Sequence, residues 1–286
     1  MKIAITGSSG FVGSHLLEYL SNECKHAVIP VSRQLLYGSL EALVESLEGC
    51  DVVIHLAGAS ILSRWTKKRK RELWNSRIKT TENLVAAFQL MNQVPKCFIS
   101  TSAVGVFDDR EVYDENSHNF SDNFLGRLAR QWELEALKAQ VLGIRTLIFR
   151  LGIVIGKDGG ALTQMLPVFR LGMGGPVGSG NQAFPFIHLK DLLKAYQFVL
   201  EHEECEGLYH LVAPDLISNR DFSIALAKQL NRPCLFRVPT WCLKLLFSEG
   251  AIVLVQGQKI LPLRITQSGF LFDYPNINVL LRDIIG

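Results

Sequence analysis

The sequence predicts an α/β fold in which helices cover both faces of a doubly wound parallel sheet, with a smaller lobe after it. Three observations support this prediction. Short valine-, isoleucine- and phenylalanine-rich runs alternate with helical patterns through the first half of the 286 residues. The runs are almost continuously apolar, as in strands that are buried on both faces. A glycine-rich turn separates the first run from the first helix. Such alternation implies right-handed crossovers between parallel strands.

The expected elements follow in chain order. Strands are expected at 2–6, 26–32, 51–58, 96–103, 143–152 and 207–214. Helices are expected at 11–24, 39–50, 123–137 and 219–230, the last with Ser218 or Asn219 as its N-cap. A helix opened by a basic stretch is expected to continue to residue 91, and 235–247 is predicted to be helical. The glycine- and proline-rich segment 157–186 breaks the strand–helix repeat, so residues 152–286 are assigned to the smaller lobe.

Composition excludes several classes of protein. A hydrophobic fraction of 48% and a charged fraction of 20% are typical of a globular chain. No apolar run reaches the ~18 residues that a membrane-spanning helix needs, so we expect no membrane partner. The opening "MKIAITGSSG" reads directly as a strand and a turn, which favours a cytoplasmic location. Six cysteines without a C-x-x-C pair argue against a disulfide framework, and no metal site is expected.

The glycine-rich turn has the spacing of a dinucleotide-binding loop. In "ITGSSGFVGSH", Gly7 would allow a tight turn, Gly10 a close approach of pyrophosphate, and Gly13 close packing of the helix on the strand. The free amides at the start of the helix would bind the anion. The predicted cofactor-binding residues of the loop are Gly7, Ser9, Gly10, Phe11, Val12 and Gly13.

The ends of the next two strands select the cofactor. After the second strand, "PVSR" places Ser32 and Arg33 where an NAD-preferring site would carry a carboxylate. Because a guanidinium can hold a 2′-phosphate, NADP(H) is the predicted cofactor. The third strand ends in His55, Leu56, Ala57 and Gly58, of which the last three would line the cofactor and His55 would be structural. Residues 1–151 are therefore predicted to form a Rossmann-like NADP-binding domain.

The stretch from Arg64 to Leu73 contains six basic residues. Such a run is compatible with contact to nucleic acid, acidic lipid or a phosphorylated ligand. A solvated, mobile start of a helix explains it better, because few aromatic residues are interleaved with the charges. We therefore expect no nucleic-acid partner, although Arg64 and Lys67 could border a cleft.

Four motifs in order, "TGSSGFVG", "VVIHLAG", "FISTSA" and "PFIHLKDL", resemble the epimerase/dehydratase branch of the extended short-chain dehydrogenases/reductases. "WTKKRKRELWNSRIKTTENLV", "WELEA", "YHLVAPDLISNRDFSIALAKQLNRP" and "GQKILPLRITQSGFLFDYP" further resemble an atypical epimerase group historically labelled a cell-division-inhibitor homologue. The second resemblance covers nearly the whole chain. It implies a Rossmann-like fold that binds NAD(P) and a substrate lobe at the carboxyl end.

The resemblance also implies residue roles. Ser102 matches the residue that hydrogen-bonds a substrate oxygen beside the nicotinamide, and Ser100 and Thr101 would line the same crevice. Arg150 and Gly152 lie in "RLGIVIG", whose backbone would flank the nicotinamide. His188 and Asp191 match a segment that supports the smaller lobe and the floor of the substrate site, and a structural role is favoured for His188.

The tyrosine and lysine of the usual mechanism are absent. The tyrosine exchanges a proton with the substrate, and a lysine four residues later lowers its pKa and holds the ribose. With Glu133 as the anchor, the two positions are Leu125 and Ala129; a slip by one residue gives Phe124 and Leu128. Neither alignment offers a proton donor or a cation.

Substitutes are conceivable in two places. Tyr113 or Glu115, in the loop "DDREVYDENSHNF", could donate a proton, although a solvated acidic surface explains the loop better. Arg130, or else Arg127, could supply positive charge near the ribose but no proton, because a guanidinium stays protonated. The predicted catalytic set is Ser102, Tyr113 and Arg130.

Two functional hypotheses follow. The first is an NADP(H)-dependent epimerase or oxidoreductase whose small polar substrate, a nucleotide-linked sugar being one option, lies between Ser102, the 108–118 loop and the 157–187 segment. The second is a catalytically weak or silent NADP(H)-binding sensor. A homodimer is compatible with either hypothesis.

Overall fold

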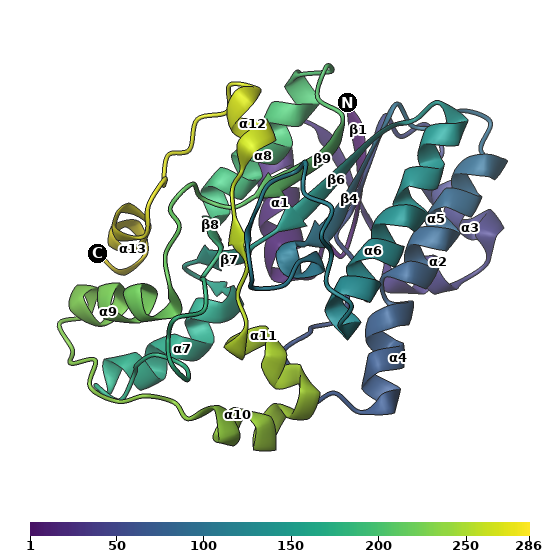
Figure 1. Ribbon diagram of the computed structural model, residues 1–286. Helices are drawn as coiled ribbons and strands as arrows, with labels where there is room; N and C mark the ends of the chain where they lie inside the picture. The colour runs from purple at the N-terminus through teal and green to yellow at the C-terminus, as the bar shows by residue number, and fades with distance from the viewer.

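The computed structural model describes all residues from Met1 to Gly286 and has a six-stranded parallel sheet at its centre (Figure 1). The strand order is β2-β1-β3-β4-β6-β9, and every neighbouring pair runs in parallel. The predicted fold class is confirmed. The strands are β1 Lys2–Thr6, β2 Ala27–Val31, β3 Val52–His55, β4 Cys97–Ala103, β6 Arg145–Leu151 and β9 Gly207–Leu211.

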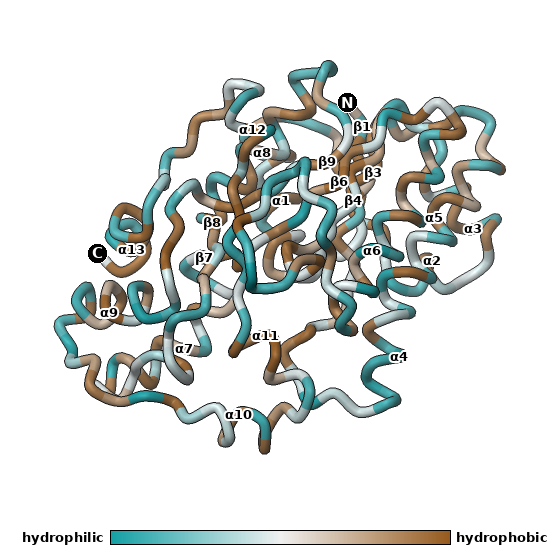
Figure 2. Tube along the Cα trace, viewed as in Figure 1, coloured by the Kyte–Doolittle hydropathy of each residue, from teal (hydrophilic) through white to brown (hydrophobic).

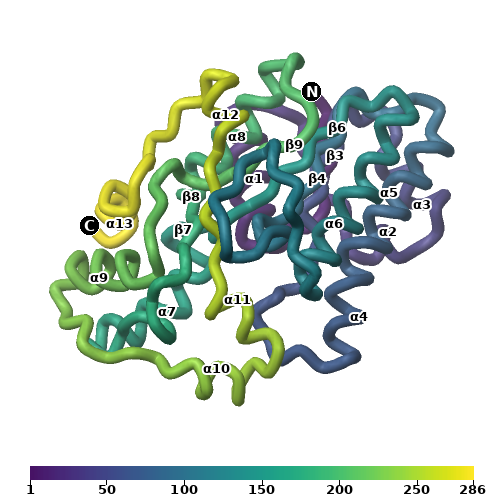
Figure 3. The backbone as a smooth tube through the Cα atoms, in the orientation of Figure 1, coloured from purple at the N-terminus to yellow at the C-terminus, as the bar shows by residue number.

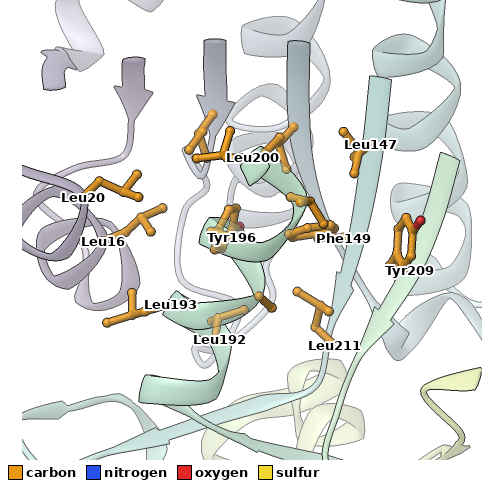
Figure 4. Packing of buried hydrophobic residues seen from close by; sticks show 14 of the residues in the cluster. Leu16, Leu20, Leu147, Phe149, Leu192, Leu193, Tyr196, Leu200, Tyr209 and Leu211 are labelled. Atoms are coloured by element: carbon orange, nitrogen blue, oxygen red, sulfur yellow. The ribbon is translucent and has the colours of Figure 1, made fainter. Parts of the chain in front are cut away.

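Helices bury the apolar side chains on both faces of the sheet. On one face lie α1 (Phe11–Asn22) and α8 (Leu189–Glu201), and Figure 4 shows Tyr196 of α8 between Leu16 of α1 and Phe149 of β6. The other face is covered by α3 (Leu40–Leu47), α5 (Ile78–Leu90) and α6 (Phe124–Leu137). None of the helices combines the length and the apolar character needed to cross a bilayer.

Residues after Gly152 contribute both to the sheet and to a separate cluster. β9 is the last strand of the sheet, whereas β7 (Ile153–Gly156) and β8 (Phe186–His188) form a small parallel pair of their own. The sequence pattern predicted neither of these two strands nor α8. The second cluster buries apolar side chains of α7 Gly160–Arg170, α9 Asn219–Gln229 and α13 Ile277–Ile285.

The segment after α9 returns across the molecule (Figure 3). It runs through α10 (Thr240–Phe247), reaches α4 (Lys67–Asn75), and then pairs β10 (Lys259–Ile260) with β5 (Val112–Tyr113). Glu249 forms an ion pair with Lys70 of α4. The remaining short elements are α2 Arg33–Tyr37, η1 Val104–Val106, η2 Lys138–Leu142, η3 Ser248–Ala251, α11 Ile252–Val255 and α12 Leu263–Gln267.

Two predicted helices differ from the structure. The helix expected to run to residue 91 without interruption is two helices, α4 and α5. At the junction, the Ser76 hydroxyl accepts a hydrogen bond from the Ala59 amide and the Arg77 guanidinium donates one to the Ala59 carbonyl oxygen. The helix expected at 235–247 begins only at Thr240, with Pro239 in extended conformation as its N-cap. The predicted N-cap of α9 is correct for Ser218, which forms a capping box with Asp221.

Candidate functional site: the carboxyl edge of the sheet

The glycine loop between β1 and α1 has no room for side chains. Gly7 has a φ of +70°, and a Cβ atom there would lie 2.8 Å from the backbone nitrogen of Ala57. A Cβ atom on Gly13 would lie 2.2 Å from the carbonyl oxygen of Gly7. The backbone of the loop, the start of α1 and the end of β3 therefore touch directly, as a dinucleotide-binding turn requires.

The amino end of α1 is open to an anion. Gly10 is the N-cap and provides no side-chain hydrogen bond, and the first turn contains no acidic residue. The first amides of a helix have no partner within the helix, and the helix dipole places partial positive charge there. The predicted binding residues Ser9, Phe11 and Val12 lie at this end. Their backbone can receive a phosphate group.

Thr6 and His55 hold the end of β3 against the glycine loop. The Thr6 hydroxyl lies 2.7 Å from His55 Nδ1 and accepts hydrogen bonds of 3.2 Å from the amides of Leu56 and Ala57. Burial, helped by the charge of Arg77, lowers the pKa of His55 to about 3, so the ring is neutral at pH 7. His55 is therefore structural, and it positions the Leu56–Gly58 segment that was predicted to line the cofactor.

Ser32 and Arg33 follow β2 at the same edge. The Ser32 hydroxyl caps α2 by accepting a hydrogen bond of 3.3 Å from the Leu35 amide. Arg33 is exposed, with its guanidinium carbon 5.6 Å from the centre of the Tyr37 ring, and it forms no salt bridge. Its charge is thus available for a ligand at this corner of the site.

The hydroxyl groups at the end of β4 point in opposite directions. Thr101 approaches the Tyr196 hydroxyl on the α8 side at 3.3 Å. Ser102 faces α6 and donates a hydrogen bond of 2.6 Å to Glu133. Ser100 is buried between the neighbouring strands. Of the three, Ser102 is committed to an internal carboxylate in this structure.

That carboxylate belongs to a buried ion pair. Arg150 Nε and Nη2 each donate to a different oxygen of Glu133, both at 2.7 Å. The guanidinium carbon also lies 5.0 Å from the centre of the Phe107 ring, and Nη1 lies 3.4 Å from Nε2 of His210. From the sequence we predicted that Arg150 lies beside the nicotinamide, but we did not predict that its side chain pairs with Glu133. A signal was available, because Glu133 follows the apolar Trp132 on the buried side of α6.

Leu125 and Ala129 lie where the sequence alignment placed them, on the side of α6 that faces the end of β4. A Cβ atom on Gly105, just after β4, would contact the Leu125 side chain at 3.8 Å. Ala129 is buried in an apolar cluster with Val104 and Val106. The positions of a tyrosine–lysine pair are thus filled by aliphatic side chains in an apolar setting.

The other two predicted catalytic residues, Tyr113 and Arg130, do not meet Ser102 in the structure. Tyr113 is only 2% exposed, stacks on Phe107 with ring centres 4.4 Å apart, and donates its hydroxyl hydrogen to Asp108. Burial, together with that hydrogen bond, raises the pKa of Tyr113 to about 12. Arg130 is exposed over Phe120, and no hydrogen bond links it to Ser102 or Tyr113.

Glu115, the alternative proton donor, is buried. One of its carboxylate oxygens accepts a hydrogen bond of 2.9 Å from the amide of His210, and the other has no partner. Burial raises the pKa of this carboxyl group. Gly152, at the end of β6, is needed for packing, since a Cβ atom there would lie 2.7 Å from the carbonyl oxygen of Pro185.

A polar cavity of about 290 Å³ lies between the loop after η1, the glycine-rich segment and the returning C-terminal segment. Two of its three walls are the 108–118 and 157–187 segments predicted to enclose a substrate, whereas Ser102 does not line it. Its charged residues have opposite signs. The lining residues are Asp109, Ser179, Asn181, Gln182, Ala183, Val255, Gly257 and Lys259.

The basic stretch is partly used in internal contacts. Arg69 donates to Ser63 at 3.0 Å and pairs with Glu72 at 2.7 Å, while Lys70 pairs with Glu249. These contacts fix α4 to the preceding loop and to the C-terminal segment. The expected mobile start of a helix is therefore an ordered helix that begins at Lys67, capped by Thr66.

Family comparisons match both parts of the chain. The model of the NAD dependent epimerase/dehydratase family matches residues 3–211. A domain of unknown function, DUF1731, matches residues 238–284. The first match includes the sheet and the glycine loop, and the second includes the returning segment and most of α13.

Similar proteins extend over the full length of the chain. The mouse epimerase family protein SDR39U1 is 35% identical over 294 residues, with 100% of both proteins covered. A chloroplastic SDR39U1 homologue of Arabidopsis thaliana is 34% identical, covering 100% of this chain and 87% of that protein. The crystal structure of human epimerase family protein SDR39U1 (isoform 2) with NADPH superimposes with a TM-score of 0.91 at 32% identity, covering 100% of this chain and 99% of that one.

Proposed function

The chain belongs to the NAD dependent epimerase/dehydratase family, and on this premise we propose that it binds NADP(H) at the carboxyl edge of the sheet and uses it in oxidoreduction or epimerisation of a small polar substrate. Two neighbouring features carry the proposal: a helix whose first amides have no side-chain cap, and an arginine that forms no salt bridge. The amino end of α1 is open, and Arg33 lies unpaired at the end of the adjacent strand β2.

The residues present fit the cofactor. Because Gly7 and Gly13 carry no Cβ atoms, the loop backbone packs directly against the start of α1, and the free amides there would hold the pyrophosphate. Arg33 would pair with the 2′-phosphate, and the Ser32 side chain caps the helix that presents it. The human relative crystallised with NADPH supports this assignment. When bound, the cofactor supplies or accepts a hydride.

The polar cavity is the proposed substrate site. Asp109 can accept hydrogen bonds, Lys259 can donate them, and the side-chain amide of Asn181 can do both. A compound with several hydroxyl groups would satisfy such a lining better than an apolar one. The Gln182 amide already donates to the carbonyl oxygens of Val177 and Leu254, which leaves its oxygen for a ligand.

A second function, cofactor sensing without turnover, is favoured by one observation. Leu125 and Ala129 cannot exchange protons, and Ala129 lies in an apolar cluster that has no room for a charged side chain. Tyr113 is a weak acid with its hydroxyl on Asp108. Catalysis would therefore need a proton from the cavity residues or from solvent.

The experiment is a fluorescence titration of the cofactor-stripped protein with NADPH and with NADH. NADPH should bind more tightly, and Arg33→Ala should weaken NADPH alone by ~10-fold or more, as expected for a charge-assisted hydrogen bond. Lys96→Ala is the matched control. It removes a cation that is 84% exposed and lies just before β4, at the end of the strand away from the proposed cofactor site. Equal affinities for the two nucleotides, or equal effects of both variants, would refute the cofactor assignment.

Turnover separates the two functions. Hydride transfer is measured in both directions: from NADPH labelled with deuterium at C4 to small carbonyl compounds, and from sugars and nucleotide sugars labelled with deuterium at the carbinol carbons to NADP⁺. Transfer that is lost in Asp109→Asn or Lys259→Met, while NADPH affinity is retained, supports the enzyme and the proposed cavity. Binding of NADPH with no transfer in either direction supports the sensor.

A further inference from the structure

An exposed apolar surface covers the outer side of the smaller lobe. Seven large side chains there are between 53% and 79% exposed. Figure 2 shows apolar residues in α10 and in the segment before it, at the lower margin of the molecule and away from the sheet. We call this region the α10 surface. Its apolar members are Leu171, Met173, Leu235, Phe236, Trp241, Leu245 and Leu246.

The α10 surface comes from two neighbouring segments. The amide of Val238 donates to the carbonyl oxygen of Pro176 at 2.9 Å, and the amide of Gly178 donates to the carbonyl oxygen of Val238 at 2.8 Å. A Cβ atom on Gly172 would lie 3.5 Å from the ring of Pro233. The end of α7 and the chain leading into α10 therefore lie side by side. The exposed side chains of the two segments are therefore brought to the same region of the molecule.

The helix at its centre has an apolar exposed face. Trp241 and Leu245 are one turn apart and so project on the same side, and Leu246 lies beside them. Only Leu243 is buried. A soluble monomer rarely leaves so many large side chains uncovered in one place, and such surfaces mark contacts with a partner or a membrane.

The segments that form the surface carry only basic charges, and the acidic residues that flank them include Asp221, which is bound to Ser218, and Glu249, which is paired with Lys70. Residues 159–182 and 222–248 contain no aspartate or glutamate, although the chain has 27 acidic residues in all. They contain five basic residues, all exposed and none in a salt bridge. The five are Arg170, Lys228, Arg232, Arg237 and Lys244.

We propose that the α10 surface binds the headgroup region of an anionic phospholipid membrane, with Trp241 and Leu245 entering the interface and the five basic residues contacting lipid phosphates. Exposed tryptophan, phenylalanine and leucine beside lysine and arginine are the composition that binds in this region. A second copy of the chain is disfavoured, because a symmetric contact through this surface would bring like charges together. This partner departs from the sequence-based expectation of no membrane, which considered only spanning segments.

Vesicle flotation of the full chain tests the proposal. The protein should float with phosphatidylcholine vesicles that contain phosphatidylglycerol, and much less with pure phosphatidylcholine. High salt should weaken the binding. Leu245→Glu should reduce binding to the anionic vesicles by at least ~10-fold, because it replaces an apolar contact by a negative charge that the anionic lipids repel. Leu271→Glu is the matched control, since Leu271 is 80% exposed outside the α10 surface.

Tryptophan fluorescence gives a second readout. Trp241 is 66% exposed, so its emission should shift to shorter wavelength on anionic vesicles, and the shift should disappear in Trp241→Phe. Equal binding to neutral and anionic vesicles, unchanged binding of Leu245→Glu, or no binding would overturn the proposal. So would a concentration-dependent dimer, seen by analytical ultracentrifugation, that Leu245→Glu abolishes.

Discussion

Glu133 of α6 and Arg150 of β6 form a buried ion pair in which two parallel hydrogen bonds, each 2.7 Å long, join the carboxylate to the guanidinium. Ser102 of β4 adds a third hydrogen bond to the same carboxylate. Glu133 therefore ties α6 to two neighbouring strands of the sheet, to β6 through Arg150 and to β4 through Ser102. In this structure the serine that resembles a substrate-binding residue serves the internal carboxylate.

Removing the carboxylate charge should destabilise the fold. Glu133→Gln leaves Arg150 buried and unpaired, so the free energy of unfolding in urea should fall by about 3–5 kcal/mol. Glu82→Gln, in α5, is the control, because both side chains of the Glu82–Lys79 pair are exposed, and it should lose less than about 1 kcal/mol. Similar losses in the two variants would contradict the assignment.

Ser102→Ala should act mainly on stability. It removes one hydrogen bond to a charged group, so the free energy of unfolding should fall by about 1–3 kcal/mol, while NADPH affinity stays within about twofold of the parent. Urea denaturation and nucleotide titration of the same sample check both values. Unchanged stability with impaired function would instead indicate a direct contact with the substrate.

Gly13→Ala should abolish nucleotide binding. The new methyl group would meet the Gly7 carbonyl oxygen at 2.2 Å and displace the loop from the start of α1, so NADPH affinity should fall by at least ~10-fold. In Gly105→Ala the nearest side-chain atom is 3.8 Å away, and affinity should be retained. Normal binding by Gly13→Ala would show that the loop is not the phosphate site.

Restoring the missing lysine should harm the protein. Ala129 lies in an apolar cluster at 5% exposure, and the carboxylate one turn away, Glu133, is already bound by Arg150 and Ser102. Ala129→Lys therefore buries an additional positive charge and should lower the free energy of unfolding by several kcal/mol at pH 7. Ala129→Met adds comparable bulk without charge. If Ala129→Met loses much less stability than Ala129→Lys, the buried charge causes the loss. Equal losses in the two variants would show that the size of the side chain causes it.

Acid should destabilise the protein through three buried histidines. Burial lowers the pKa of His55 to about 3, and burial with the Arg150 charge does the same for His210. Burial also lowers the pKa of His188, to about 4. Between pH 6.5 and about 3 the unfolded chain binds protons that the folded chain does not. Stability is therefore full above pH 6.5 and falls on acidification, by up to about 1.4 kcal/mol per pH unit for each histidine.

The slope of unfolding free energy against pH tests this expectation. His210→Asn should remove about a third of the contribution of the three buried histidines to the slope between pH 6.5 and pH 4.5, whatever its effect at pH 7. His118→Asn changes an exposed ring and should leave the slope as it is. A slope that His210→Asn does not alter would mean that other groups control acid unfolding.

Much of the fold was predictable because its determinants are local. Buried parallel strands show as apolar runs, and a dinucleotide loop needs its glycines at set distances from a strand end and a helix start. The break at Ser76 and Arg77 was not predictable in this way. It depends on the backbone of Ala59, which folding brings to that point.

The sequence by itself determined the doubly wound sheet, the glycine loop, Arg33 at the end of β2 and the lack of a tyrosine–lysine pair, since each depends on residue type and spacing along the chain. Only the tertiary structure decided that Glu133 neutralises Arg150, that the Tyr113 hydroxyl donates a hydrogen bond to Asp108, and that the α10 surface is exposed. Which buried charge finds a partner, and which apolar side chain finds cover, depends on contacts between distant segments.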